Sequence, residues 1–498
     1  MTSSGARARA DAVVVGSGPN ALAAAVTLAR AGLSVHVIEG AETPGGGCRT
    51  QELTLPGYWH DVCSAVHPLA SASPFFAGAG LAAHGVRLLT PKVAFAHPLD
   101  GGRAAAVSGS AEQTALGLGA DGRAYSQLLQ PLVRDMPAIL PDLLAPLGRS
   151  LPAHPVAMTR FGLEGLLPAS VLARRFSGDE AKALLAGVAG HTMRPLTAPL
   201  TSGFGLMFLM IAHSVGWPLV EGGSARIVDA LIAELSALGG RVETGRWVQS
   251  LESLPAARAV VLDVTPRQFV ALAGSRLPAR HRAALERFRY GPGVCKVDWA
   301  LSGPVPWQAP ACLEAGTVHV CGTFAEVAQS EADVAAGRHP ERPFCLVAQP
   351  GVVDPGRAPA GKHTLWGYCH VPAGSTVDMT ARIEAQIERF APGFRDLILA
   401  RSVRTAAEQE RHNPNYIGGD IGGGASTLRQ TFLRPTPRWN PYRTAIPGVY
   451  LCSSSTPPGG GVHGMCGDWA ARTALADLGA RDRRRARVPG NAAPGSGG

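Results

Sequence analysis

Residues 11–21 read DAVVVGSGPNA, and this stretch decides the fold class. The apolar run Val13–Val15 has the composition of a buried strand, and the glycine turn Gly16–Gly18 follows it directly. Residues 20–32 are rich in helix formers, and residues 33–39 alternate like a second strand. A strand, a glycine turn, a helix and a strand in this order predict a βαβ unit with a parallel strand pair.

Each position of the glycine turn has a physical role in a dinucleotide-binding fold. The first glycine makes the tight turn, the second lets the backbone approach a pyrophosphate, and the third permits close packing of helix and strand. Gly16 and Gly18 hold the first two places, and Ala21, whose methyl group still packs closely, holds the third. Glu39 ends the second strand, where an acid accepts hydrogen bonds from a ribose. The unit therefore predicts dinucleotide binding, with the phosphates at the helix N-terminus.

Two further glycine segments favour FAD over NAD. The segment PGGGCRT, residues 44–50, lets the chain pass close to cofactor phosphates and offers Arg49 as a counter-charge. The segment PPGGGVHGMCGDW, residues 457–469, opens a helix near the other end of the chain. Three such segments at both ends of the sequence fit a long cofactor that spans the molecule, and we expect FAD.

These segments supply the candidate cofactor-binding residues. The candidates are Gly16, Gly18, Pro19, Asn20, Ala21, Glu39, Gly45, Gly46, Gly47, Arg49, Thr50, Ser453, Gly459, Gly460, Gly461, Val462 and His463. No metal site is expected, because the nine cysteines are irregularly spaced and include no C-x-x-C pair.

Composition predicts a compact globular protein of two or three domains. Of the 498 residues, 46% are hydrophobic and 17% are charged. The formal net charge is +9, and part of it lies in an arginine-rich C-terminal segment. We interpret this segment as a disordered basic tail, with peripheral contact to an anionic membrane surface as the alternative. Nucleic-acid binding is not expected, because the other basic residues are not gathered into one aromatic-studded stretch.

The cysteine usage and the apolar stretches predict a cytoplasmic protein. An odd number of irregularly spaced cysteines argues against a disulfide framework and favours a reducing compartment. The first ten residues lack the apolar centre of a signal peptide. The longest apolar stretch, residues 203–220, is interrupted by glycines and Pro218, and it is too short to span a bilayer comfortably. We predict a buried or cavity-lining helix there, with a membrane-dipping helix as the alternative.

The predicted fold class is α/β, with a doubly wound FAD-binding domain of the Rossmann type. A second α/β stretch begins near residue 220, and a strand, a glycine loop and a helix complete this domain at the C-terminal end. Alternating segments such as VCKVDWAL predict a mixed sheet in an inserted α+β substrate domain. The expected ranges are 11–105, 218–275 and 440–480 for the FAD domain, 106–217 and 276–439 for the substrate domain, and 483–498 for the disordered tail.

Five segments resemble the carotenoid/retinoid oxidoreductases, the phytoene desaturase-like flavoproteins that include a phytoene dehydrogenase-related and a pyridine nucleotide-disulfide oxidoreductase domain 2-like branch. The segments are VVVGSGPNALAAAVTLARAGLSVHVIE, PGGGCRT, VEGGSARIVDAL, NPNYIGGDIGGG and GVYLCSSSTPPGGGVHG. The last is similar to the family's C-terminal flavin segment, with Ser453 in place of the usual glycine. Gly47 stands where the family often has arginine, and Pro457 stands where desaturases often have histidine.

The resemblance implies an FAD-dependent oxidoreductase that takes hydride from, or isomerises, an apolar polyene, lipid or secondary metabolite. In such flavoproteins the flavin carries the redox chemistry, and the protein binds, orients and excludes water. Candidates for proton transfer are His463 in the glycine loop, and His60 and His67 near the second glycine segment. A structural hydrogen bond is the alternative role for each. The loop RHNPNYIGGD, residues 411–420, is a candidate wall of the flavin or substrate site.

Two other functions remain open from the sequence. An amine-oxidase-like flavin dehydrogenase would favour an aromatic cage, whereas only 6% of residues are aromatic. A non-catalytic lipid- or prenyl-binding protein of the same fold would not need intact glycine segments at both ends. The absence of a C-x4-C pair argues against a dithiol relay of the glutathione reductase type. The sequence does not define the substrate, the electron acceptor or the oligomeric state.

Overall fold

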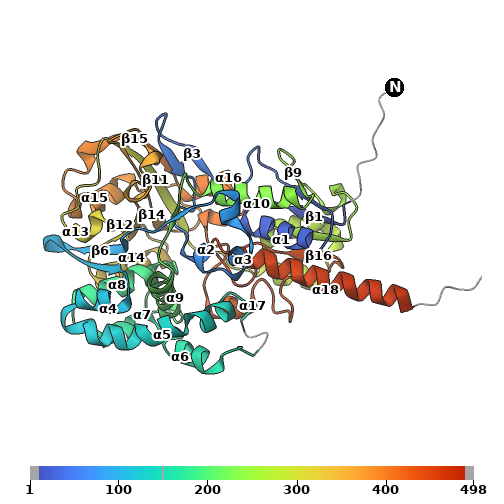
Figure 1. Ribbon diagram of the computed structural model, residues 1–498, viewed down its shortest axis with the longest axis horizontal. Coiled ribbons are helices and arrows are strands. Elements are labelled where there is room, and N and C mark those ends of the chain that lie inside the picture. The colour runs from blue at the N-terminus through green and yellow to red at the C-terminus, as the bar shows by residue number, and fades with distance from the viewer. Residues whose placement is uncertain (1–9, 148–150, 488–498) are drawn as a thin grey trace, which may run out of the picture.

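The computed structural model describes residues 10–147 and 151–487 and contains two main sheets (Figure 1). The first is parallel, and its strand order is β16 (Val449–Leu451), β10 (Ala259–Leu262), β1 (Ala12–Val15), β2 (Val35–Ile38) and β9 (Arg241–Glu243). The expected strands at both ends of the chain therefore lie in one sheet. The parallel pairing of β1 with β2 confirms the βαβ prediction.

Helices cover both faces of this parallel sheet, as a doubly wound fold requires. One face packs against α1 (Pro19–Arg30), α10 (Ala225–Ala237) and α18 (Met465–Arg487). The opposite face packs against α11 (Pro266–Ala273) and α12 (Ala279–Glu286). Alternate side chains of each strand enter the two cores, because successive strand residues point to opposite faces. The predicted α/β fold class is confirmed.

Helices α1 and α18 make the closest contact of this layer. Ala21, Ala23 and Ala24 of α1 are completely buried, and Gly467 of α18 lies against them. A Cβ atom on Gly467 would lie 1.8 Å from the carbonyl oxygen of Asn20. Small residues on both helices therefore let the backbones touch, which fixes the C-terminal glycine segment beside the N-terminal one.

The second sheet has seven strands and is mixed. Its order is β15 (Ile398–Arg404), β11 (Gly293–Leu301), β14 (His363–Val371), β13 (Cys345–Ala348), β12 (Ala315–Val320), β6 (Val93–Leu99) and β7 (Arg103–Ser108). Only β6 and β12 pair in parallel. The helices α13 (Pro310–Leu313), α14 (Phe324–Ala335), α15 (Thr380–Phe390) and α16 (Ala406–His412) lie beside this sheet.

The position of the β6–β7 hairpin differs from the expected boundary between the FAD domain and the substrate domain. The limit placed between residues 105 and 106 falls inside β7, and both strands pair in the mixed sheet rather than in the parallel one. All seven residues of β6 are buried and one of them is Pro98, so this strand has no alternating pattern that would mark it. We propose that the first segment of the substrate domain begins before β6.

A helical layer packs under the mixed sheet (Figure 1). It consists of α4 (Ala111–Leu116), α5 (Gly122–Leu143), α6 (Pro155–Gly165), α7 (Ala169–Leu172), α8 (Asp179–Gly190) and α9 (Thr201–Ser214). Helix α9 is the predicted apolar helix, and one of its faces is buried in the core. Across the described residues no single helix is both long and apolar enough to cross a membrane. The segments Pro155–Gly165 and Ala169–Arg175 pass that test together, but as a pair bent by 89°.

Short elements complete the chain. They are the two-stranded sheets β3 (Thr50–Glu52) with β4 (Trp59–Asp61) and β5 (Leu88–Leu89) with β8 (Leu219–Val220), and the helices α2 (Pro68–Ala72), α3 (Pro74–Gly78) and α17 (Leu428–Leu433). The expected disordered tail from residue 483 is wrong over residues 483–487, because α18 continues to Arg487. Arginine is a good helix former, so the basic run extends the helix. Residues 488–498 lie outside the described part of the chain.

The α1–α18 contact predicts a large loss of stability for Gly467→Ala. The added methyl group meets the backbone of α1, which has no room to move, so we expect a loss of about 3 kcal/mol in the free energy of unfolding. Urea unfolding followed by circular dichroism measures this change. Gly162→Ala on α6 is the control, because a Cβ there meets no atom within 4 Å. Equal stability of the two variants would contradict the contact.

Candidate functional site

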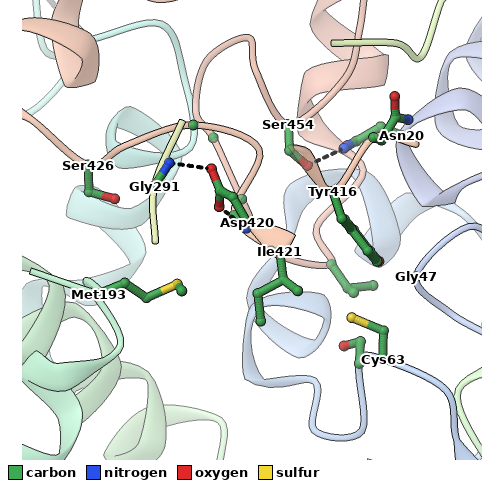
Figure 2. A pocket seen from close by; sticks show the side chains of 18 of the residues that line it. Asn20, Gly47, Cys63, Met193, Gly291, Tyr416, Asp420, Ile421, Ser426 and Ser454 are labelled. Atoms are coloured by element: carbon green, nitrogen blue, oxygen red, sulfur yellow. Dashed lines mark hydrogen bonds between the residues drawn. The ribbon is translucent and has the colours of Figure 1, made fainter. Parts of the chain in front are cut away.

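A cavity of about 1430 Å³ lies where the three glycine segments meet (Figure 2). It begins at the carboxyl ends of the parallel strands, which is where ligands bind in open α/β sheets. It continues to β14 of the mixed sheet and to the helices α5, α6 and α9. The volume exceeds the roughly 300–1,000 Å³ typical of small-ligand pockets, so a long ligand and a second molecule have room together.

Most of the predicted cofactor-binding residues line this cavity. They are Gly16, Gly18, Pro19, Asn20, Glu39, Gly46, Gly47, Arg49, Gly459, Gly460, Gly461, Val462 and His463. The structure does not place Ala21, Gly45, Thr50 and Ser453 in the cavity wall.

Ser17 joins the first two glycine segments. Its hydroxyl donates to the Glu39 carboxylate over 2.6 Å and accepts from the Gly45 amide over 3.1 Å. The amides of Ser17 and Ala41 also donate to Glu39, both over 2.8 Å. These donors hold the Glu39 carboxylate at the cavity wall, where the sequence places a ribose partner.

Thr50 and Ser453 are directed away from the cavity by other hydrogen bonds. The Thr50 hydroxyl donates to Asp61 over 2.9 Å. Asp61 in turn forms a buried ion pair with Arg357. The Ser453 hydroxyl donates to the Val264 carbonyl over 2.8 Å, which ties the end of β16 to the end of β10.

The glycine loops lie so close to neighbouring backbone that a side chain at these positions would clash with it. A Cβ on Gly46 would lie 3.0 Å from the Cα of Gly18, and one on Gly460 would lie 2.7 Å from the Gly422 carbonyl oxygen. The N-cap residue of α1, Gly18, offers no side-chain cap. Pro19 has no N–H and the Ala21 amide donates to Asp263, so the Asn20 amide is the donor of this first turn that an anion can use. The Asn20 side-chain nitrogen adds a donor at the same wall, where it lies 3.5 Å from the Ser454 hydroxyl, and its buried oxygen is an acceptor without a partner among the described residues. This donor set fits the pyrophosphate of a dinucleotide.

Arg49 lines the cavity, and its side chain forms hydrogen bonds within its own loop. Its guanidinium donates to the carbonyls of Thr43 over 2.7 Å and Pro44 over 3.3 Å. The side chain thus braces the second glycine segment while its charge remains beside the cavity. The expected role as a phosphate counter-charge stays a prediction.

His463 uses both ring nitrogens within the C-terminal loop. Nδ1 accepts from the Met465 amide over 3.0 Å, and Nε2 lies 3.1 Å from the Gly459 carbonyl oxygen. Burial lowers the pKa of His463 to about 4, so the ring is neutral at neutral pH. These bonds support the structural alternative for His463.

The other two candidate histidines have different surroundings. His60 does not line the cavity, because its Nε2 lies 2.8 Å from the Thr54 hydroxyl and its ring packs near Asp298. Burial lowers its pKa to about 3. His67 does line the cavity, and neither of its buried ring nitrogens has a hydrogen-bond partner in the described structure. Burial lowers the pKa of His67 to about 4, so a neutral imidazole faces the cavity.

The loop predicted from RHNPNYIGGD forms part of the cavity wall. Tyr416 lies against the second glycine segment, since a Cβ on Gly47 would be 2.6 Å from its hydroxyl oxygen. Asp420 accepts from the amides of Gly291 over 2.7 Å and Gly422 over 2.8 Å, and it is 1% exposed (Figure 2). Asp420 therefore organises the loop through these backbone donors, while burial raises the pKa of its carboxyl.

The end of the cavity away from the glycine loops is an apolar chamber. Its wall includes Met158 and Phe161 of α6 and Phe204, Met207 and Phe208 of α9, and Trp366 and Tyr368 of β14 also line the cavity. Trp366 and Tyr368 alternate along β14 and pack edge to face with ring centroids 5.2 Å apart. Because alternate residues of a strand point to the same face, Trp366 and Tyr368 share one face of β14, but only the structure shows that this face meets the cavity.

His191 brings a histidine cluster to the chamber that the sequence did not reveal. Its Nε2 lies 2.9 Å from Nε2 of His319. Nδ1 atoms of His319 and His97 both lie within 3 Å of the point where a Cβ of Gly187 would be. Glycine at this position lets the two rings approach each other. Burial lowers the pKa of His191 to about 3, so it faces the chamber as a neutral group.

Asp263 is a further residue that the sequence did not reveal. It follows β10, and its carboxylate accepts from the Ala21 amide over 3.3 Å beside the first glycine turn. Cβ atoms on Gly16 and Gly18 would lie 3.1 Å from its Cβ and 2.9 Å from its Oδ2, respectively. Burial raises the pKa of Asp263 to about 7, and the nearby charge of Glu39 adds to this effect.

Comparison with known proteins supports an oxidoreductase. Residues 14–76 match the family model of the NAD(P)-binding Rossmann-like domain. The chain is 27% identical to pyridine nucleotide-disulfide oxidoreductase domain-containing protein 2 of Mus musculus, over 94% of each chain. It is 28% identical to an all-trans-zeta-carotene desaturase of Myxococcus xanthus, over 51% of each chain.

Solved structures share the fold at low sequence identity. An oxidoreductase from Methanosarcina mazei superposes with a TM-score of 0.64 and 16% identity, covering 93% of this chain and 99% of that one. Putrescine oxidase bound to putrescine superposes with a TM-score of 0.58 and 19% identity, covering 94% of this chain and 99% of that one. The chain thus has the fold of flavin-type oxidoreductases, and the comparisons leave carotenoid specificity open.

The raised pKa of Asp263 predicts that the free energy of unfolding of the ligand-free protein falls as the pH rises. The folded protein keeps a proton up to about pH 7, whereas an unfolded aspartate loses it near pH 3.9. Stability contributed by the protonated form is therefore lost between about pH 4 and pH 7. Asp263→Asn removes this loss, so the ligand-free variant is expected to be more stable than wild type at pH 8. Water in the cavity weakens the effect, and we expect about 1–3 kcal/mol.

Thermal unfolding of both proteins at pH 5 and pH 8 measures this difference. Glu42→Gln, on an exposed position near the same cavity end, controls for the loss of one negative charge. A stability gain that is equal at both pH values, or no gain, would contradict the raised pKa of Asp263.

Proposed function

We propose that the protein is an FAD-dependent oxidoreductase that dehydrogenates or isomerises an apolar polyene, lipid or secondary metabolite. The observation that supports this proposal is the continuity of one cavity, which joins three glycine segments to an apolar chamber. A binding module for a dinucleotide alone would not need the chamber.

The described residues suggest how FAD would be held. Glu39 is positioned for the ribose, and the uncapped N-terminus of α1 for the pyrophosphate. Gly459–Gly461, in the glycine segment near the C-terminal end of the chain, line the cavity and would lie beside the isoalloxazine part of FAD. Bound flavin would supply hydride transfer. The chain itself would orient the substrate and exclude water, because the chamber wall is apolar.

The distribution of acids favours an apolar substrate over an amine. The carboxylates in the described cavity wall are Glu39, Asp263 and Asp420, and each lies at a glycine loop. An ammonium group in the apolar chamber would have no counter-charge, which is costly in an apolar environment. The similarity to a carotene desaturase supports a polyene, and the fold shared with putrescine oxidase keeps an amine as the competing class.

Anaerobic reduction of the bound flavin tests this proposal. The purified protein is mixed without oxygen with a polyene, an unsaturated lipid and a primary amine, and the visible flavin absorbance is followed. We expect bleaching by a member of the polyene or lipid group and none by the amine. Bleaching by the amine alone would favour the amine-oxidase-like function. Lipid binding to a protein that holds no flavin would favour a non-catalytic lipid carrier.

A further inference from the structure

The loop between α8 and α9 concentrates backbone strain at the cavity. Met193 has φ 55° and Leu200 has φ 73°, and in the described chain these are the non-glycine residues with positive φ. Both line the cavity. Left-handed conformations of such residues cost about 1–3 kcal/mol and cluster at binding and catalytic sites. The strain suggests that the position of residues 193–200 matters for what the cavity binds.

Arg194 lies in this strained loop and also lines the cavity. Its guanidinium donates to the Ser426 carbonyl over 2.9 Å. Figure 2 shows Met193 and Ser426 on the same side of the cavity, so this bond connects the strained loop to the C-terminal half of the wall. An arginine carries more donors than one carbonyl uses, and the remaining ones are available.

The charge of Arg194 is not balanced by an acid within the described structure. No ion pair of Arg194 with a carboxylate is formed there, unlike Arg246, which pairs with Glu243 at the other end of the cavity. Burial lowers the pKa of Arg194, as expected for a cation that has lost water without gaining an anion. The side chain remains charged at neutral pH.

The other two arginines of the wall touch glycine segments instead. The side chain of Arg49 packs 3.1 Å from the Cβ position of Gly45, and Arg434 Nη1 lies 2.7 Å from that of Gly459. They therefore belong with the cofactor half. Arg194 is flanked by Met193 and Pro195, which also line the cavity. It places a positive charge in a wall that otherwise continues into the apolar chamber.

We propose that the substrate is an amphiphile with an apolar chain and an anionic carboxylate head, and that Arg194 binds the head. This inference rests on the proposed function and names the substrate class of the same cavity. A planar guanidinium can bind a carboxylate through two parallel hydrogen bonds, and partial burial strengthens such a pair. The apolar chamber then accepts the chain, with the buried area supplying most of the affinity.

Equilibrium binding of a fluorescent polyene acid tests this proposal separately from redox activity. The probe is cis-parinaric acid, and its methyl ester has the same chain without the charge. Both are titrated into the full-length protein as purified, and their fluorescence reports entry into an apolar site. We expect the acid to bind about 10- to 100-fold more tightly than the ester, the range of a charged hydrogen bond.

Substitution of Arg194 identifies the group responsible. In Arg194→Gln the acid is expected to lose about 10-fold or more in affinity while the ester changes less than about twofold. Arg194→Lys is expected to retain part of the preference for the acid, because the charge remains but the two-bond geometry does not. The control is Arg87→Gln, since Arg87 is an exposed arginine that pairs with Glu221 and does not line the cavity.

The outcomes separate the two proposals. Equal affinity of acid and ester for the wild-type protein overturns the carboxylate head, whatever the variants do. An equal loss for acid and ester in Arg194→Gln assigns a structural role to Arg194 and also overturns the inference. Flavin content is measured on the same samples, so a protein without flavin that still prefers the acid through Arg194 contradicts only the redox proposal.

Discussion

The backbone contact between Gly467 of α18 and Asn20 of α1 is the constraint on which the cavity depends. It joins the last helix of the chain to the first, and no other residue type fits at Gly467 without moving a backbone. The glycine loop that precedes α18 is thereby fixed beside the turn that opens α1. Segments from the two ends of the sequence can then form one wall.

Close contacts between glycine backbones also form other parts of the cavity wall. Gly46 meets Gly18, and Gly460 meets the loop that Asp420 organises. Glycine backbone therefore forms much of the cofactor half, which lets a phosphate group come close to the chain. The substrate half has the opposite character: aromatic and aliphatic side chains line it, and its charge comes from Arg194. Two ligands of different polarity can occupy one continuous cavity in this arrangement.

Local patterns predicted the cofactor half because its residues are close in sequence. The strand, turn, helix and acid around Gly16 to Glu39 follow from short-range periodicity and turn chemistry, and the structure has them. The β6–β7 hairpin escaped prediction because β6 is wholly buried and lacks alternation. The sequence also did not predict three other cavity residues, Asp263, His191 and Arg194. Each reaches the cavity through packing between segments far apart in the sequence, and such packing leaves no local sequence pattern. The hydrogen bonds that occupy His463 are likewise visible only in the folded chain.

Flavin content of the purified protein tests the central claim most directly. The wild-type chain and the variants Glu39→Ala and Glu42→Ala are denatured, and the released cofactor is identified and quantified by chromatography. The wild type should release FAD in nearly stoichiometric amount, Glu39→Ala should have lost most of it, and Glu42→Ala should match the wild type. A wild-type protein that holds no flavin and takes up none when FAD is added would contradict the account, as would a Glu39→Ala variant with full FAD content.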